Sequence, residues 1–369
     1  MKKIILYSSI LTIAGLFLFL WFYSTPIQAK SKTEYSSKNQ EKIVSEDSLI
    51  SLVAVGDMML GTNFPNSSYL PHKDTLLLKP MFEYLRNADL TFGNLEGTVL
   101  NEGGDVKKCG DPTKCYAFRQ PEYFVDQLKD AGFDILSLAN NHMGDFGETG
   151  RANTQRILKE KKLHYAGLDS CPWDTLTKNG VKYGFTAFAP NTSCLQITDY
   201  EQAQTIVKKL DKMCDIVIVS FHGGAEGSSR THVTRKTEIF YDEDRGNVYE
   251  FARKVIDAGA DVVLGHGPHV TRAIDYYKGR FITYSMGNFC TYARFNLKGI
   301  SGMAPLFELK LNKKGEFVSG KVISTKQLGD GGPILDPLQG AFEQIKILTS
   351  QDIPELKVEF GPDATFKFK

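Results

Sequence analysis

A regular alternation of short apolar runs with amphipathic segments begins at Leu49 and constrains the fold of this 369-residue chain more than any other feature. The apolar runs are predicted as strands over residues 49–55, 90–92, 135–138, 182–187, 216–220, 262–264 and 281–285. The segments between them have helical periodicity and are predicted as helices over residues 80–86, 121–131, 148–160, 201–212 and 247–258. Strands that alternate with helices are typical of α/β proteins.

The C-terminal third of the chain has a different pattern. After about Met303, two alternating runs flank a glycine-containing turn and predict a β-hairpin. The tail is rich in proline and holds one predicted helix over residues 338–349. We therefore predict a main domain over residues 49–330 and a C-terminal extension, residues 331–369, that packs on it.

The N-terminal segment predicts export from the cytosol. Lys2 and Lys3 precede a charge-free apolar run over residues 4–23, which is long enough to span a membrane as a helix. A cleavage site after Ala29 is the alternative, although Ile27 stands where signal peptides carry a small residue. Residues 1–29 are thus predicted as a transmembrane anchor or a signal peptide, and residues 30–48, which are polar, as a flexible linker. The positive N-terminus predicts a body that faces outward, either membrane-anchored or exported.

The net charge argues against nucleic acid as a partner, and the cysteine content bears on disulfide formation outside the cytosol. The 44 basic and 43 acidic residues leave a net charge of +1, so no overall field recruits nucleic acid. Six cysteines in an exported chain favour some disulfides. Cys109 and Cys115 flank a turn-rich loop and are the clearest pair, although both could be free thiols, whereas Cys214 has the context of a buried apolar residue.

Polar residues of the kinds that bind metals occur where the predicted strands end. They are Asp57, Asn94, Glu96, Asn140, Asn141, His142, His222, Glu226, His266, His269 and Asn288. Taken singly, each has a structural interpretation, as a helix cap, a turn residue, a surface side chain or a buried neutral histidine. Because residues beyond the carboxyl ends of strands meet in one crevice of an α/β sheet, a single site explains them together.

The residue types indicate a metal site. A carboxylate can bridge two cations, and amide oxygens and imidazoles can complete the coordination. We therefore predict that one or two divalent ions are bound by Asp57, Glu96, Asn141, His222, His266 and His269. Mixed oxygen and nitrogen ligands without thiolate favour Mn, Fe or Zn over Mg. His142 is the candidate general acid, and Asn94, Asn140, Glu226 and Asn288 are candidate substrate contacts. Asp145 is expected to cap the helix that follows it.

Six motifs in one order resemble the CapA/PGA_cap family of bacterial capsule and poly-γ-glutamate synthesis proteins. They are VAVGDMMLG, GNLEGTV, FDILSLANNHMGDFG, SFHGGAE, GADVVLGHGPHV and YSMGNF. The resemblance covers residues 51–352 and implies a fold similar to calcineurin-like metallophosphoesterases. That fold is a four-layer sandwich of two mixed sheets flanked by helices, with a dinuclear site at the strand ends.

The resemblance also assigns positions within the site. Asp57 and Glu96 match the first aspartate and the bridging acid, and Met59 stands where phosphoesterases have a histidine, as in the CapA pattern. Asn141 and His142 match the Asn-His pair, His222 the lone histidine, and His266 and His269 the final histidine motif. Gly223 and Gly267 replace a tryptophan and a histidine that are usual in the family.

Three functions are compatible with these residues. The first, which the ligand set favours, is a metal-dependent hydrolase that acts on a phosphoester or on the amide backbone of a polymer. The second is a non-catalytic component that binds or exports an anionic polymer beside membrane capsule synthase subunits. The third is a purely structural role, in which a bound metal only stabilises the fold, although structural sites prefer closed four-coordinate shells.

Overall fold

The computed structural model describes residues 49–109 and 115–369. The predicted anchor or signal, residues 1–29, and the predicted linker, residues 30–48, lie outside the described residues. Within the described ranges, none of the helices combines the length and the apolar character that a membrane crossing requires.

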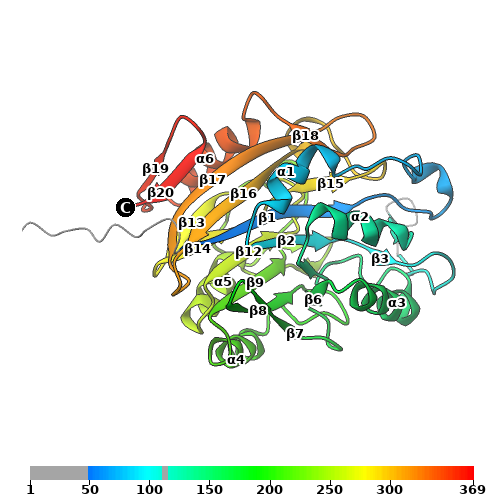
Figure 1. Cartoon of the computed structure of the whole chain (residues 1–369), viewed down its shortest axis with the longest axis horizontal. Coiled ribbons are helices and arrows are strands. Elements are labelled where there is room, and N and C mark those ends of the chain that lie inside the picture. The colour runs from blue at the N-terminus through cyan, green and yellow to red at the C-terminus, as the bar shows by residue number, and fades with distance from the viewer. Residues whose placement is uncertain (1–48, 110–114) are drawn as a thin grey trace, which may run out of the picture. The chain divides into compact units, whose positions relative to one another are not determined.

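The larger of two mixed sheets has ten strands and contains both ends of the described chain (Figure 1). Its parallel half consists of β1 (Ile50–Met59), β2 (Leu90–Leu95), β5 (Ile135–Ser137) and β6 (His164–Ala166). Its antiparallel half consists of β16 (Met303–Leu311), β17 (Phe317–Gln327), β20 (Thr365–Phe368) and β19 (Val358–Phe360). Two further strands pair with interior strands of this sheet, β15 (Asn288–Thr291) with β1 and β18 (Pro333–Leu335) with β17.

The second sheet has six strands, and its centre is parallel. In order they are β13 (Ile274–Tyr277), β14 (Arg280–Thr283), β12 (Val262–His266), β9 (Ile216–His222), β8 (Val181–Phe188) and β7 (Trp173–Lys178). Two small sheets complete the strands, β3 (Thr98–Val99) with β4 (Arg119–Gln120) and β10 (Ile239–Phe240) with β11 (Glu243–Asp244).

Alternation along the strands places the two sheets face to face. In β9, Ile216 and Ile218 belong to the core between the sheets, whereas Val217 and Val219 belong to a second core. The second core contains the buried faces of α4 (Tyr200–Asp211) and α5 (Val248–Asp257). Because successive side chains of a strand point to opposite faces, this sheet is covered on both sides, as central parallel strands require.

The first sheet is covered in the same way. Phe92 of β2 faces the second sheet and packs against Phe185 of β8, with ring centroids 5.6 Å apart. The hydroxyl of its neighbour Thr91 points the opposite way and donates to the Leu85 carbonyl of α1 (Phe82–Arg86) at 2.7 Å. The layers therefore run helix, sheet, sheet, helix. The remaining helices are α2 (Tyr123–Ala131), α3 (Gly147–Glu160) and α6 (Gly340–Asp352).

The mixed α/β fold is confirmed, as are the hairpin formed by β16 and β17 and the helix in the tail, α6. Several predicted strands end too early, because β1 runs through to Met59, β2 to Leu95 and β9 to His222. Two others run too far, since β5 ends at Ser137 and β14 at Thr283. The added segments contain Gly56, Asp57, Gly93, Asn94 and His222, which interrupt the apolar runs. Pairing with neighbouring strands holds these segments in register. Strand β7 was not predicted, since its sequence WDTLTK is polar and forms a partly exposed edge.

Candidate metal centre

Strand register brings the predicted residues together from both sheets. In the first sheet Asp57 lies between two register partners, Asn94 of β2 and Asn288 of β15. In the second sheet His222 of β9 and His266 of β12 are direct partners. All of these strands are parallel to their neighbours here, so their carboxyl ends point to one region of the molecule.

Asp57 is hydrogen-bonded to three other residues of this region. It is fully buried, and its two carboxylate oxygens accept hydrogen bonds from different imidazoles. His266 Nδ1 lies 3.1 Å from Oδ1, and His269 Nδ1 lies 3.0 Å from Oδ2. The Asn94 amide donates to Oδ1 at 2.9 Å. These bonds orient both histidines so that each Nε2 atom points away from Asp57.

Glu96 lies opposite Asp57 and is surrounded by the Nε2 atoms of histidines. Its Oε1 lies 3.6 Å from His269, 3.7 Å from His222 and 3.9 Å from His142. One ligand atom from each of Asp57, Glu96, His222 and His269 falls within 4.8 Å of the others. These spacings are too long for direct hydrogen bonds, and they leave a position between the side chains that a cation fits.

Several buried polar atoms of this region have no hydrogen-bond partner. They are both oxygens of Glu96, Nε2 of His222, Nε2 of His266, Oδ1 of Asn141 and Oδ1 of Asn288. An unpartnered buried polar atom costs about 1–3 kcal/mol, and proteins bury few of them. Since so many are collected in one place and all can donate an electron pair, the set fits a bound cation.

The pKa values in this region are shifted by burial and by the neighbouring charges. Burial raises the pKa of Glu96 well above its usual value, and the nearby Asp57 and Glu226 carboxylates add to the effect. Burial alone raises the pKa of Asp57 too, but the hydrogen bonds and charges of His266 and His269 outweigh it and hold the pKa below its usual range.

The histidines are shifted in opposite directions. Burial lowers the pKa of His222 well below its usual value, and the positive charge of Arg245 lowers it further. Burial also lowers the pKa of His269, but Glu96 and Asp57 reverse this and raise it to about 10. The carboxylate charges that raise the pKa of His269 would also attract a bound cation, which would replace the proton on Nε2.

The predicted amides lie around the centre in supporting positions. Asn140 is buried and donates to Asn94 Oδ1 at 3.2 Å and to the Leu95 carbonyl at 2.9 Å. Asn288 donates to the His269 carbonyl at 3.2 Å. Asn141 donates to Glu226 Oε1 at 3.3 Å, which leaves its own oxygen free.

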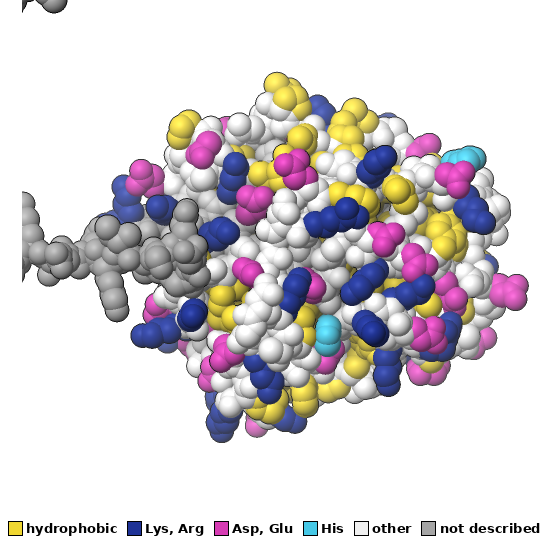
Figure 2. All heavy atoms as spheres, in the orientation of Figure 1, with side chains coloured by type: hydrophobic (Ala, Val, Ile, Leu, Met, Phe, Trp, Pro, Cys, Tyr) yellow, Lys and Arg dark blue, Asp and Glu magenta, His cyan; other side chains and the backbone are white. Residues whose placement is uncertain are grey.

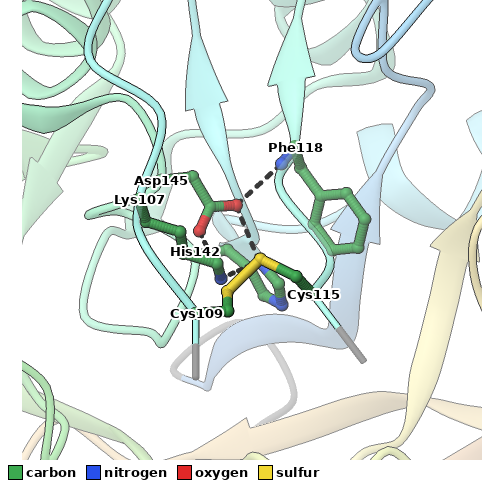
Figure 3. Close-up of a disulfide and its surroundings, with 6 residues drawn as sticks. All are labelled: Lys107, Cys109, Cys115, Phe118, His142 and Asp145. Atoms are coloured by element: carbon green, nitrogen blue, oxygen red, sulfur yellow. Dashed lines mark hydrogen bonds and ion pairs between the residues drawn. A yellow bond between two sulfur atoms is a disulfide. The ribbon is translucent and has the colours of Figure 1, made fainter. Parts of the chain in front are cut away.

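His142 is held by a network that the sequence did not reveal (Figure 3). Its Nδ1 lies 2.8 Å from Asp145 Oδ2, so the neutral ring carries its proton there and directs Nε2 toward Glu96. Asp145 also accepts from the Phe118 amide at 2.7 Å and pairs with Lys107 at 2.6 Å. Burial lowers the pKa of His142, and the Asp145 charge opposes this shift.

The helix-capping role expected for Asp145 is wrong. The N-cap of α3 is Phe146, which makes no side-chain cap hydrogen bond. The carboxylate of Asp145 turns instead toward His142, because a buried imidazole needs a partner for its Nδ1 proton. The spacing of three residues between His142 and Asp145 was a signal that sequence reasoning overlooked.

The disulfide between Cys109 and Cys115 is present, with Cα atoms 5.8 Å apart. It joins the two segments that hold Asp145, since Lys107 precedes Cys109 and Phe118 follows Cys115 (Figure 3). The ring of Phe118 lies on the His142 imidazole with centroids 4.1 Å apart.

Arg245 also contacts the candidate site, and the sequence analysis did not single it out. It is almost fully buried, its guanidinium pairs with Glu226 at 3.0 Å, and it approaches His222 Nδ1 at 3.4 Å. It lies in a loop between β11 and α5, far from the motifs. Arg245 thereby fixes Glu226 beside the candidate centre.

The two glycines that depart from the family pattern pack against each other. Gly267 has a φ of +116°, which favours glycine, and a Cβ there would lie 2.6 Å from the Gly223 carbonyl. The Gly223 amide also donates to the His266 carbonyl at 2.9 Å. This backbone approach leaves no room for a side chain at residue 267 and places His266 next to His222.

Fold and site together define the class, an α/β protein with buried carboxylates and imidazoles gathered at the carboxyl ends of parallel strands. The chain belongs to the family described as "Bacterial capsule synthesis protein PGA_cap", which residues 51–293 match. The CapA/PGA_cap resemblance of the motifs is therefore confirmed.

The chain is similar to curated members of capsule systems. It is 30% identical over 252 residues to the capsule biosynthesis protein CapA of Bacillus anthracis, which covers 63% of this chain and 57% of that protein. It is 29% identical over 255 residues to the PGA biosynthesis protein CapA of Bacillus subtilis, and this match covers 64% of this chain and 62% of that protein. The chain thus spans less than two thirds of the length of these relatives.

Solved structures with some likeness include two phosphoesterases. The 5'-nucleotidase precursor of Thermus thermophilus has a TM-score of 0.41 at 13% identity and covers 85% of this chain and 61% of its own. The purple acid phosphatase PPD1 of yellow lupin has a TM-score of 0.39 at 13% identity, with 79% and 55% covered.

Proposed function

We propose that this chain is an extracytoplasmic protein of capsule or poly-γ-glutamate biosynthesis whose centre binds one or two divalent metal ions and hydrolyses a phosphoester or a polymer amide. The observation that carries the proposal is the set of buried, unpartnered electron-pair donors around Glu96. Location outside the cytosol is supported by the apolar N-terminal run and by the disulfide.

The donor set suits particular metals. Asp57, Glu96, His222 and His269 would hold the first ion. The free atoms of His266 and Asn141 are available for a second ion or for completing the first coordination shell. Oxygen and nitrogen donors without thiolate favour Mn, Fe or Zn over Mg.

The chain's own residues supply proton transfer and orientation. A bound metal would supply Lewis-acid polarisation of the reacting group. His142 is neutral when its pKa is lowered, so Nε2 can accept a proton on the side of Glu96 and return it to a leaving oxygen or nitrogen. Asp145 holds the ring in the required tautomer through Nδ1. Arg245 orients Glu226 at the edge of the same region.

A second function is non-catalytic binding or export of an anionic polymer beside membrane synthase subunits. It is favoured by Met59, a thioether that stands where related phosphoesterases have a metal-binding histidine. The names of the two Bacillus relatives refer to capsule and PGA biosynthesis rather than to hydrolysis.

Metal content and turnover of the purified full chain separate these functions. We expect bound metal, turnover of a generic phosphodiester or of poly-γ-glutamate, and loss of both in His222→Ala. His72→Ala is the matched control, because the His72 side chain is 81% exposed. Unchanged metal content and turnover in His222→Ala would contradict a metal-dependent hydrolase. Loss of surface polymer in that variant, with no turnover by the wild type, would favour the second function.

A further inference from the structure

Arg294 is a cation that has no anionic partner among the described residues. Its guanidinium lies over two tyrosine rings, 4.7 Å from the centroid of Tyr69 and 4.8 Å from that of Tyr116. Its Nε is buried and makes no hydrogen bond. The buried arginines Arg245 and Arg272 differ, since each pairs with a carboxylate within 3.0 Å.

Aromatic contacts connect Arg294 to the candidate centre. The next residue, Phe295, packs edge-on against the His269 ring, with centroids 5.5 Å apart. Phe295 also stacks on Phe118 at 5.1 Å, and Phe118 lies on His142 at 4.1 Å. Arg294 is thus next in sequence to Phe295, which contacts the proposed metal ligand His269.

Contact with two aromatic rings prepares the guanidinium to bind an anion. The rings restrict the plane of the guanidinium, so less side-chain entropy is lost when its fork of N–H donors binds a planar acceptor. A carboxylate or a phosphate can accept two parallel hydrogen bonds from this fork. A partly buried cation without a counter-ion is unfavourable, and an anionic ligand would relieve that cost.

We infer that Arg294, clamped by Tyr69 and Tyr116, is an anion-binding subsite that holds a carboxylate or phosphate group of the substrate beside the candidate metal centre. The inference rests on the proposed function for the position of the reacting bond, but the anion subsite has a test of its own. Lys107 does not compete for this role, because it is already paired with Asp145.

The test is anion binding by the full chain in the presence of a metal chelator. The probes are inorganic phosphate and a short γ-linked glutamate oligomer, and the readout is titration calorimetry. Arg294→Met should weaken the binding of at least one probe by tenfold or more, and Arg294→Lys should weaken it less, because the charge remains without the planar fork. Arg86→Met is the matched control, since Arg86 stacks on Phe82 at 4.0 Å on helix α1.

The outcomes separate the ligand classes and the two hypotheses. A loss for the glutamate oligomer alone assigns a carboxylate, and a loss for phosphate alone assigns a phosphate. Equal binding by wild type and Arg294→Met, or no binding of either probe by the wild type, would overturn the subsite. Because no metal is present in the titration, the result stands whether or not the hydrolase proposal survives. If the wild type turns over a substrate, Arg294→Met should raise KM by a larger factor than it lowers kcat.

Discussion

Replacing Glu96 by glutamine should stabilise the metal-free protein while removing its response to metal. Glu96 is fully buried and both of its carboxylate oxygens lack a hydrogen-bond partner. Burial raises its pKa well above the usual value, so the native state disfavours the charged form that the unfolded chain adopts at neutral pH. A glutamine amide is neutral and can donate toward His222 Nε2, which lies 3.7 Å from Oε1 and is itself unpartnered.

The expected magnitudes follow from these contacts. Relief of one unsatisfied buried group is worth about 1–3 kcal/mol, so Glu96→Gln should raise the free energy of unfolding by about that amount in a chelator. With metal at about one thousand times its Kd, the wild type should gain about 4.1 kcal/mol. The variant should gain far less, because an amide is a poorer metal ligand than a carboxylate. The order of stability should therefore reverse when metal is added.

Guanidinium denaturation with chelator and with Mn²⁺ measures both effects. Glu83→Gln, a change of the same type at an exposed position of α1, is the control and should leave both curves unchanged. A Glu96→Gln protein that is less stable than wild type in chelator would refute the claim that the carboxylate is kept at a cost. An equal gain from metal in both proteins would refute its role as a ligand.

Three further predictions concern the surroundings of the centre and the core. Asp145→Asn should lower kcat by one to two orders of magnitude with little change in metal content, because the His142 tautomer is no longer fixed; loss of metal in this variant would contradict a role limited to orientation. Serine at both Cys109 and Cys115 should lower the free energy of unfolding by about 2 kcal/mol, the loop-closure value for a separation of 6 residues. It should also speed hydrogen exchange in the segment that contains the amide donated to Asp145, and unchanged exchange would count against the disulfide as a support. Burial raises the pKa of Asp261 from 3.8 to about 6, so its stabilising contribution is full below pH 3.8 and is lost as the pH rises to about 6. Relative to Asp261→Asn, the wild type should therefore lose about 3 kcal/mol of unfolding free energy between about pH 3.5 and 7, and parallel pH profiles would show that the shift is absent.

The surface adds little to the choice between functions. On the face drawn in Figure 2, basic and acidic side chains are interspersed. An anionic ligand would thus be recognised by local groups such as Arg294 rather than by an overall field.

The sequence by itself determined the fold class and indicated which residues would gather at the candidate site. Strand periodicity and the position of polar residues at strand ends depend only on local chemistry, so they are readable from the chain. The carboxyl ends of parallel strands meet in one region, and for this reason Asp57, Glu96, His222 and His269 were predicted as one cluster and lie within 4.8 Å.

Only the tertiary structure decided which atoms of that cluster are free and which are already bonded. Strand register sets Asp57 between Asn94 and Asn288, and a shift by one residue would reverse the faces. Asp145 does not cap the helix, because its carboxylate pairs with the buried imidazole of His142. The Arg294 guanidinium lies over Tyr69 and Tyr116, two residues far earlier in the chain. The roles of Asp57, Asp145 and Arg294 depend on burial, on side-chain orientation and on contacts between residues distant in the chain. None of these is a property of local sequence.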